Sequence, residues 1–338
     1  MKLFGKDLSR EVAVIAEIGV NHEGDVDVAA KLVAAAAEAK ADAVKFQSYT
    51  PARYVSRSDR ERFERVSRFS LNEAAHRRLA KEAERCGIAF ISAAISEDWV
   101  PLLAELGPAV KIASGDLTFE PVIRAAAESG RVVILSTGGG TIEEVDEAVG
   151  WVRDVCGGTL AERLVLLHCV SLYPALIGQA NLRAIPFLAE RYGVAVGWSN
   201  HVIGSEACLA AVAVGARVVE VHVTDRKTGR AFRDHHLSFE PQDLADMVAA
   251  IGRVTSSLGA PTKAPQPEEI AILKTMRKGI VAACDITAGT VVQPMHLSFA
   301  RPATEFTASE LPQLIGAVAT RAISSGELIT RGAVRLKS

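Results

Sequence analysis

The sequence predicts an α/β protein: a (β/α)8 TIM barrel followed by a small, mostly β C-terminal domain. Two observations predict the barrel. Eight short apolar runs rich in valine and isoleucine recur up to residue 223, and segments of helical periodicity separate most of them. Alternating strands and helices predict a parallel sheet, and eight repeats in about 250 residues predict its closure. Further on, short β-type runs with Ala-Gly and Ser-Gly turns predict the second domain.

The predicted strands come in regular order. They span residues 12–19, 42–47, 88–95, 109–115, 131–138, 163–170, 194–200 and 217–223. Segments such as FEPVIRAAAESG (119–130) and TIEEVDEAVGWVRDV (141–155) have the spacing of amphipathic helices. An open, doubly wound sheet is the structural alternative that this periodicity leaves open.

The domain boundary is predicted where the alternation stops. Residues 254–270 are rich in proline and small polar residues, which is typical of a linker. We therefore expect a barrel domain over 1–255, a linker over 256–276 and the small domain over 277–338.

Composition excludes several classes of partner. The chain has 38 basic and 40 acidic residues, so no global field draws it to nucleic acid or an anionic membrane surface. No run of 18 apolar residues suggests a membrane span. The five cysteines are odd in number and scattered, and the N-terminal residues lack an apolar signal core. We expect a reduced, cytoplasmic protein.

Polar side chains mark the carboxyl end of nearly every predicted strand. They are Glu17, Lys45, Gln47, Ser92, Lys111, Ser114, Ser136, His168, Ser199, His201 and His222. In a (β/α)8 barrel this rim is where active sites form. A single serine or histidine at the end of a strand usually has a structural role. The same pattern at the ends of nearly all eight strands predicts an active site.

Two kinds of chemistry are suggested at this rim. Lys45 and Lys111 lie inside apolar runs where solvation is poor, which favours anion binding over the alternative of solvated surface charges. His201 and His222 end consecutive strands, so both imidazoles could bind one divalent ion with open positions. The residues alone favour the alternative of two core histidines bonded to the backbone.

Several longer segments match one family in its order. They include AEIGVNHEG (16–24), ADAVKFQ (41–47), VKIASGD (110–116), ILSTGG (134–139), HCVSLYP (168–174), GWSNH (197–201), DHHLSFEP (234–241) and RKGIVAACDITAGT (277–290). On these segments the chain resembles the sialic acid synthase family, the phosphoenolpyruvate-dependent synthases of nonulosonic acids, from about residue 12 to 335. Its small domain resembles the family's antifreeze-like (SAF) domain.

The resemblance implies a role for each matching residue. Phosphoenolpyruvate would be bound by Lys45, Lys111, Ser114, Ser136 and Ser199. Glu17 matches the catalytic glutamate, and His201 and His222 match the ligands of a divalent metal, manganese or alternatively magnesium or cobalt. The acceptor would be bound by Asn21, Gln47, Tyr173, Asp234 and Arg301. Tyr173 as a packed aromatic and Arg301 as an exposed side chain without a role are the plain alternatives.

The implied reaction joins phosphoenolpyruvate to an open-chain aldose, giving a 2-keto-3-deoxy sugar acid and inorganic phosphate. The implied assembly is a domain-swapped homodimer in which each antifreeze-like domain offers Arg301 to the partner's barrel. Two other functions stay open: a catalytically silent sugar-acid-binding or scaffold paralogue, and the synthesis of a different 3-deoxy-2-ulosonic acid. The presence of Glu17, His201 and His222 argues against a catalytically silent paralogue.

Departures from the family pattern concentrate on the acceptor side. Ala93, Asp116, Ser171 and Asn200 stand where the family usually has threonine, glutamate, asparagine and aspartate, and residues 303–306 lack the usual glycines. We therefore expect an acceptor other than plain N-acetylmannosamine, or one that is bound differently. We also expect Asn200 to remove a charge beside the metal, and Ala93 to remove a phosphate hydroxyl.

Overall fold

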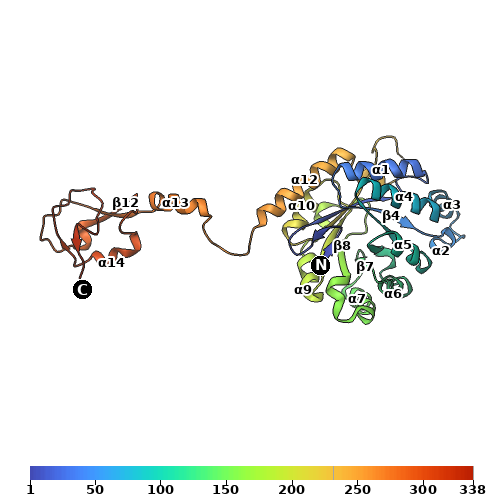
Figure 1. The fold of residues 1–338 in the computed structure, drawn as a ribbon, viewed down its shortest axis with the longest axis horizontal. Coiled ribbons are helices and arrows are strands. Elements are labelled where there is room, and N and C mark those ends of the chain that lie inside the picture. Colours follow the sequence, from blue (N-terminus) through green and yellow to red (C-terminus); the bar gives the residue numbers. More distant parts are fainter. Residues whose placement is uncertain (231, 338) are drawn as a thin grey trace. The chain divides into compact units, whose positions relative to one another are not determined.

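The computed structural model describes residues 1–230 and 232–337, which form two compact units, Met1–Gly259 and Ala260–Ser338. The first unit confirms the predicted barrel. Eight parallel strands close in the order β10-β3-β4-β5-β6-β7-β8-β9 (Figure 1). They are β3 Ala13–Gly19, β4 Ala43–Ser48, β5 Ala89–Ala94, β6 Ala109–Ile112, β7 Val132–Ser136, β8 Leu164–Cys169, β9 Ala195–Asn200 and β10 Val218–His222. The open-sheet alternative is excluded.

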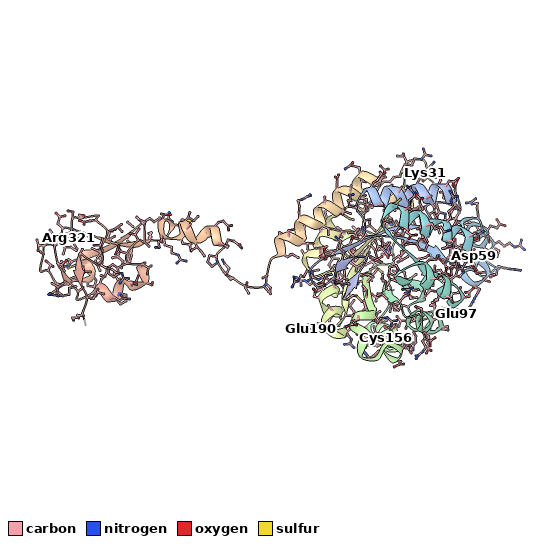
Figure 2. The ribbon with its side chains drawn as sticks, in the orientation of Figure 1. Lys31, Asp59, Glu97, Cys156, Glu190 and Arg321 are labelled. Carbon is pink, nitrogen blue, oxygen red and sulfur yellow. The ribbon has the colours of Figure 1, made fainter. Side chains whose placement is uncertain are left out.

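Helices alternate with these strands and surround them. They are α1 Val26–Glu38, α2 Pro51–Tyr54, α3 Arg60–Phe69, α4 Glu73–Cys86, α5 Val100–Leu106, α6 Glu120–Glu128, α7 Ile142–Cys156, α8 Leu160–Arg163, α9 Ala184–Tyr192, α10 Glu206–Ala213, α11 Asp234–Leu237 and α12 Pro241–Leu258. Short 3-10 turns are η1 Glu97–Trp99, η2 Ser114–Asp116, η3 Gly157–Thr159 and η4 Ile177–Gln179. Charged side chains such as Lys31, Asp59 and Glu190 point outward from this helical layer (Figure 2). No helix in the described ranges has the length and apolar character needed to cross a membrane.

Strand alternation divides the core in two. Side chains such as Val14 and Ala16 pack outward against the helices, while Ala13 and Ile15 face the barrel axis with Ile91 and Ile134. A hairpin of β1 Lys2–Leu3 and β2 Lys6–Asp7 precedes the barrel, and Leu3 packs into the same axial cluster. The inward positions are therefore apolar at the amino ends of the strands.

The second unit is small and contains the predicted β strands together with short helices. Its elements are α13 Pro267–Met276, β11 Gly279–Ala282, η5 Pro294–His296, β12 Leu297–Ala300, η6 Ala308–Glu310, α14 Leu311–Leu314, β13 Val318–Ala319 and β14 Val334–Arg335. Strand β11 pairs with β12 and β13 with β14, both antiparallel, around a core that includes Ile280, Phe306 and Leu314.

The segment expected to be a linker contains regular structure. Residues 256–276 hold the last turn of α12 and the whole of α13, which begins with Pro267 at its first position and a capping box between Gln266 and Glu269. The contact boundary lies after Gly259. The role of 256–276 as a linker stays a prediction.

Candidate active site

The inward positions change character at the carboxyl ends of the strands. Continuing the alternation of Ala13 and Ile15 brings Glu17 into the barrel mouth, and β10 likewise runs from Val218 through Glu220 to His222. The register pairs His222 with Glu17 across the closing seam of the barrel. The mouth is thus mostly polar because one parity of most strands ends in polar residues, whereas β5 contributes Ala93.

These residues line one large cavity in the first unit. Its volume is about 1510 Å³, which exceeds the roughly 300–1,000 Å³ of a typical small-molecule pocket and leaves room for two substrates. The predicted site residues in its wall are Glu17, Lys45, Gln47, Lys111, Ser114, Ser136, Tyr173, Ser199, His201, His222 and Asp234. Asn21 is absent from the wall, and Arg301 is exposed in the second unit. Contact of Arg301 with an acceptor stays a prediction.

A buried triad of charges forms the floor of the cavity. Lys45 Nζ lies 3.2 Å from Glu17 Oε2 and 3.0 Å from Glu220 Oε2, and all three side chains are buried. Neither Oε2 atom has a hydrogen-bond partner of good geometry among the described residues, so Lys45 is what compensates both. Ser199 Oγ donates to Glu220 Oε1 at 2.9 Å.

The pKa values of the two glutamates of this triad are shifted in opposite directions. Burial raises the pKa of Glu17, and the opposing charge of Lys45 does not cancel this effect. Burial also acts to raise the pKa of Glu220, but the charges of Lys45 and Lys111 and the hydrogen bonds from Lys45 and Ser199 outweigh it and lower the pKa. Glu17 is therefore the carboxyl that can hold a proton near neutral pH, while Glu220 stays ionised.

Lys111 provides a second cation. Its Nζ donates to the Ile112 carbonyl at 2.8 Å and to Ser136 Oγ at 2.6 Å, which leaves one of its three N–H groups for a ligand. Burial, and then the charge of Lys45, lower the pKa of Lys111 to about 8. An anion bound here would raise this pKa and favour the charged form further.

Hydroxyl and backbone donors surround Lys111. Ser114 Oγ accepts from the Gly138 amide at 3.1 Å and lies 3.1 Å from Cys169 Sγ. A Cβ on Gly138 would lie 2.5 Å from Ser171 Oγ, 2.6 Å from Cys169 Sγ and 2.9 Å from Ser114 Oγ. Only glycine therefore fits between these side chains at the wall of the cavity.

The two histidines lie close together, and each has a ring nitrogen that could bind a ligand. Their ring centroids are 5.4 Å apart, and Tyr173 stacks on His201 at 4.0 Å. His201 Nδ1 lies 2.6 Å from the Val170 carbonyl, which can only accept, so Nδ1 carries the proton and Nε2 is left for a ligand. Nδ1 of His222 is buried without a hydrogen-bond partner in the described ranges.

Both histidines are also neutral. Burial lowers the pKa of each, and it takes the pKa of His222 well below its ordinary value. Neutral imidazole is the form that binds a metal. No group of three or more His, Cys, Asp or Glu residues suited to a metal occurs in the described part of the chain, so two protein ligands would leave positions for substrate.

The outer wall carries the residues expected near the acceptor. Arg233 lies over the Tyr173 ring at 4.8 Å, and its Nε is 3.3 Å from Asp234 Oδ1, which has no hydrogen-bond partner of good geometry among the described residues. Burial raises the pKa of Asp234. A substrate hydroxyl could donate to this carboxylate, since ionised oxygens accept and cannot donate.

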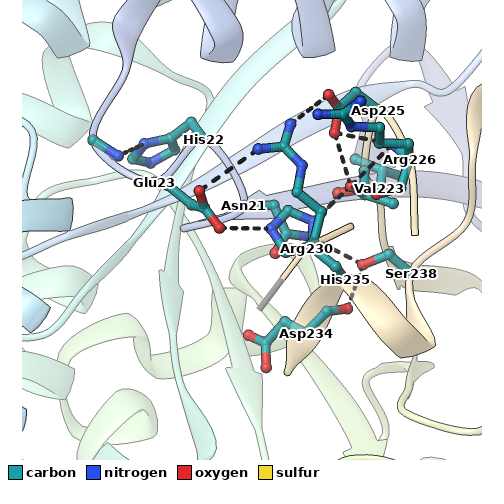
Figure 3. A network of polar contacts seen from close by, with 12 residues as sticks. Asn21, His22, Glu23, Val223, Asp225, Arg226, Arg230, Asp234, His235 and Ser238 are labelled. Atoms are coloured by element: carbon teal, nitrogen blue, oxygen red, sulfur yellow. Dashed lines mark hydrogen bonds and ion pairs between the residues drawn. The ribbon is translucent and has the colours of Figure 1, made fainter. Parts of the chain in front are cut away.

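Asn21 supports this wall from behind. Its Nδ2 donates to the Val223 carbonyl at 2.8 Å and to Ser238 Oγ at 3.0 Å, and Ser238 Oγ donates to the Asp234 carbonyl at 2.6 Å (Figure 3). Asn21 thus fixes α11 and with it Asp234. The structure gives Asn21 a positioning contact where the resemblance implied an acceptor contact.

Two further polar groups are satisfied away from the cavity. Asn200 Oδ1 accepts from Trp198 Nε1 at 3.0 Å, and its Nδ2 donates to the Val202 carbonyl at 2.7 Å. Asn200 is absent from the cavity wall, so the structure does not support a role for it beside the metal. His168 likewise turns outward, with Nε2 2.9 Å from the Ala180 carbonyl. In contrast, Ala93 and Ser171 do line the cavity.

Sequence reasoning missed Glu220 and three arginines. Glu220 precedes His222 by two residues in an apolar strand, so it shares the inward face, and this signal was available in VVEVHV. Arg62, Arg65 and Arg68 of α3 also line the cavity. Their place in a long connection after β4 is not tied to a strand end, so no periodic signal marks them.

Comparisons with known proteins show which families and relatives this chain is similar to. The NeuB family profile matches residues 32–263, and the SAF domain profile matches residues 277–335. N,N'-diacetyllegionaminic acid synthase from Campylobacter jejuni is 34% identical over 335 residues, covering 95% of this chain and 99% of its own length. Human N-acetylneuraminate-9-phosphate synthase is 33% identical, covering 82% of this chain and 80% of its own length.

Solved structures are similar as well. A sialic acid synthetase from Leptospira borgpetersenii has a TM-score of 0.73 and 34% identity, covering 77% of this chain and 90% of its own. A putative spore coat polysaccharide biosynthesis protein E from Chromobacterium violaceum has a TM-score of 0.80 and 25% identity, covering 96% of this chain and 100% of its own.

Proposed function

The chain belongs to the NeuB family, and on that premise we propose that it condenses phosphoenolpyruvate with an open-chain aldose. The products are a 2-keto-3-deoxy sugar acid of the nonulosonic type and inorganic phosphate. One observation carries the proposal: two buried lysines, two neutral histidines and a glutamate of raised pKa converge on one cavity at the carboxyl ends of the barrel strands.

Phosphoenolpyruvate would lie against the lysines. Its carboxylate and phosphate need fixed cations and hydroxyl donors, and Lys45, Lys111, Ser114, Ser136 and Ser199 supply them. Because Glu220 stays ionised, it keeps Lys45 charged, and it holds Ser199 in place by accepting a hydrogen bond from its Oγ. The pocket is thereby organised before substrate arrives.

The aldehyde end of the acceptor would lie at His201 and His222. These residues fit a divalent cation, manganese in our proposal, since both imidazoles are neutral and His222 Nδ1 lacks a partner among the described residues. When bound, such an ion polarises a carbonyl oxygen. Tyr173 packs on His201 and Asp234 stands at the outer wall, where they hold the sugar in line.

The bond changes balance as follows. Carbon 3 of phosphoenolpyruvate bonds to the aldehyde carbon, and the aldehyde oxygen takes a proton that Glu17 supplies. Water adds to the electron-poor carbon 2 that this leaves, and one proton of that water returns to Glu17. In the resulting hemiketal phosphate the bond from carbon 2 to the phosphate oxygen breaks, and the hydroxyl on carbon 2 gives its proton to the departing phosphate and becomes the 2-keto group.

Phosphate release tests this proposal. We expect release that requires phosphoenolpyruvate, an aldose from a panel of acylamino hexoses and other aldoses, and a divalent cation, and that stops on chelation. His222→Ala should abolish turnover, whereas His236→Ala, at an exposed histidine next to α11's buried residues, should not. Full activity after chelation or in His222→Ala would reject the metal assignment, and no release with any aldose would reject the reaction.

We also propose an assembly and a location for this enzyme. The family resemblance supports a domain-swapped homodimer in which Arg301 reaches the partner's acceptor, and sedimentation as a monomer at working concentration would contradict it. The described cysteines are all free, which supports a reducing, cytoplasmic setting.

A further inference from the structure

Three arginines on one face of α3 form an unused cationic wall of the cavity. Arg62, Arg65 and Arg68 are spaced three residues apart, so they are neighbours on the helix surface. Like charges at this spacing repel and do not stabilise the helix itself. We call these three residues the arginine wall.

The arginine wall has little internal compensation. The described residues offer Arg62 and Arg68 no carboxylate within 4.0 Å; their guanidinium groups lie 5.7 Å from the Tyr54 ring and 4.9 Å from the Phe69 ring. Arg65 has only Glu61 at 3.8 Å, and that glutamate is 94% exposed. In contrast, Arg53 in the same cavity is already paired with Glu97 and Asp98.

The helix that carries the arginine wall is anchored to the barrel. Val66 and Phe69 are buried in an apolar cluster with Val20, Tyr49, Val55 and Ile95. The end of α3 also lies against the turn after β3, since a Cβ on Gly24 would lie 2.3 Å from the Arg68 carbonyl oxygen. The arginine backbones are therefore held in place, and only their side chains need ordering when a ligand binds.

The arginine wall and the charges that serve phosphoenolpyruvate come from different elements of the fold. Lys45 and Lys111 sit on β4 and β6, at the strand ends, whereas α3 belongs to the long connection between β4 and α4. The acceptor's aldehyde is needed at the histidines of β9 and β10, so its opposite end extends into the outer part of the cavity. Three guanidinium groups match the oxygens of a phosphate dianion better than a neutral hydroxyl group.

We propose that the acceptor is an aldose phosphorylated at the end remote from its aldehyde, and that Arg62, Arg65 and Arg68 bind this phosphate. The proposal rests on the proposed function, because it assigns the second substrate of the same site. It makes the arginine wall a determinant of substrate specificity, distinct from the residues that perform the condensation.

Paired substrates test the proposal. N-acetylmannosamine, N-acetylglucosamine and mannose are each assayed with and without a 6-phosphate, and kcat/KM is compared within each pair. We expect the phosphorylated member of the productive pair to be preferred by about a hundredfold or more, since each charge-assisted hydrogen bond is worth about tenfold to a hundredfold. A neutral sugar used equally well or better would overturn the proposal.

Variants locate the effect. Arg62→Gln, Arg65→Gln and Arg68→Gln should each raise the KM for the phosphorylated acceptor by about tenfold or more, with little change in kcat or in the KM for phosphoenolpyruvate. Arg60→Gln is the matched control, because Arg60 lies on the same helix outside the cavity wall. A rise confined to the KM for phosphoenolpyruvate would show that the arginines serve that substrate, and would overturn the proposal.

Calorimetry separates this proposal from the reaction itself. Titration with each sugar and its 6-phosphate, in the presence of phosphoenolpyruvate, should show tighter binding of the phosphorylated member, lost in the triple Arg→Gln variant. That result without phosphate release would retain the arginine wall and reject the proposed reaction. Equal binding of both members throughout the panel would reject the arginine wall whatever the turnover.

Discussion

Replacing Lys45 by methionine should expose how strongly the buried triad depends on its one cation. Lys45 lies within 3.2 Å of Glu17 and 3.0 Å of Glu220, and its side chain is 6% exposed. Methionine retains most of the buried volume but no charge. Both carboxyl groups would then lack the partner that compensates their Oε2 atoms.

The expected loss is large because the charges left behind are desolvated. Removing one partner of a buried ion pair costs about 3–5 kcal/mol of folding free energy. Here the removal of Lys45 leaves two buried carboxyl groups without their cation. Much of this cost reflects uncompensated charge and not lost packing. Neutralising the carboxyls as well, in the triple variant Glu17→Gln, Lys45→Met, Glu220→Gln, should recover most of the lost stability.

Urea unfolding followed by tryptophan fluorescence measures this in the barrel alone. Trp99, Trp151 and Trp198 are the only tryptophans of the chain, and all lie in the first unit. The deficit of Lys45→Met should shrink on acidification from about pH 8 to about pH 5. Without Lys45 the folded state favours protonated carboxyls, so their folded pKa exceeds the unfolded value, and their stabilising contribution declines as pH rises.

An equal loss in the single and triple variants would refute this reasoning, because it would assign the whole effect to packing of the lysine stem. A deficit for Lys45→Met that is independent of pH would refute it as well. Glu220→Gln alone provides a further check: it removes a negative charge near Glu17, and the pKa of Glu17 should fall toward its ordinary range.

Two further predictions concern the turn after β3. Burial lowers the pKa of His22 to about 4, and its Nδ1 accepts from the Gly24 amide at 3.0 Å, so the folded state requires neutral imidazole. The contribution of His22 to stability should therefore be complete above the unfolded pKa of about 6.5 and fall by about 3 kcal/mol as pH drops to about 4, and His22→Gln should lack this contribution while it keeps those of the other buried histidines; identical pH curves would contradict it. Gly24→Ala would place alanine at a φ of +90° and bring its Cβ into a clash with the Arg68 carbonyl oxygen. Gly87→Ala would place alanine at a similar φ of +71°, but its Cβ would point into open space. Gly87→Ala should cost about 1–2 kcal/mol and Gly24→Ala distinctly more by the same urea titration, and equal losses would dismiss the clash.

The residues predicted at the strand ends are those that line the observed barrel mouth, because side chains alternate between the two faces of a strand with a period of two. Once Glu17, Lys45, Lys111 and His222 lie at the carboxyl ends of inward-facing runs, closure of the sheet brings them together without further information. Glu220 follows from the same rule, although the resemblance did not draw attention to it. The nature of the second unit was likewise readable from its short β-type runs and Gly-containing turns.

Other features depended on contacts between distant segments. Asn21 and Asn200 look like site residues in the sequence, but their Nδ2 groups donate to the backbone carbonyls of Val223 and Val202. For Asn21, only folding brings that carbonyl into reach. The opposite pKa shifts of Glu17 and Glu220 arise from burial beside a shared lysine.

The sequence by itself determined the barrel, the order of its strands and the chemistry at their ends, because local apolar periodicity and strand parity encode all three. The tertiary structure alone decided the outer wall of the cavity. Arg62, Arg65 and Arg68 reach it because Val66 and Phe69 anchor α3 on the mouth, in a connection whose path no periodic pattern specifies. The acceptor preference that we propose for these arginines therefore depends on packing between segments.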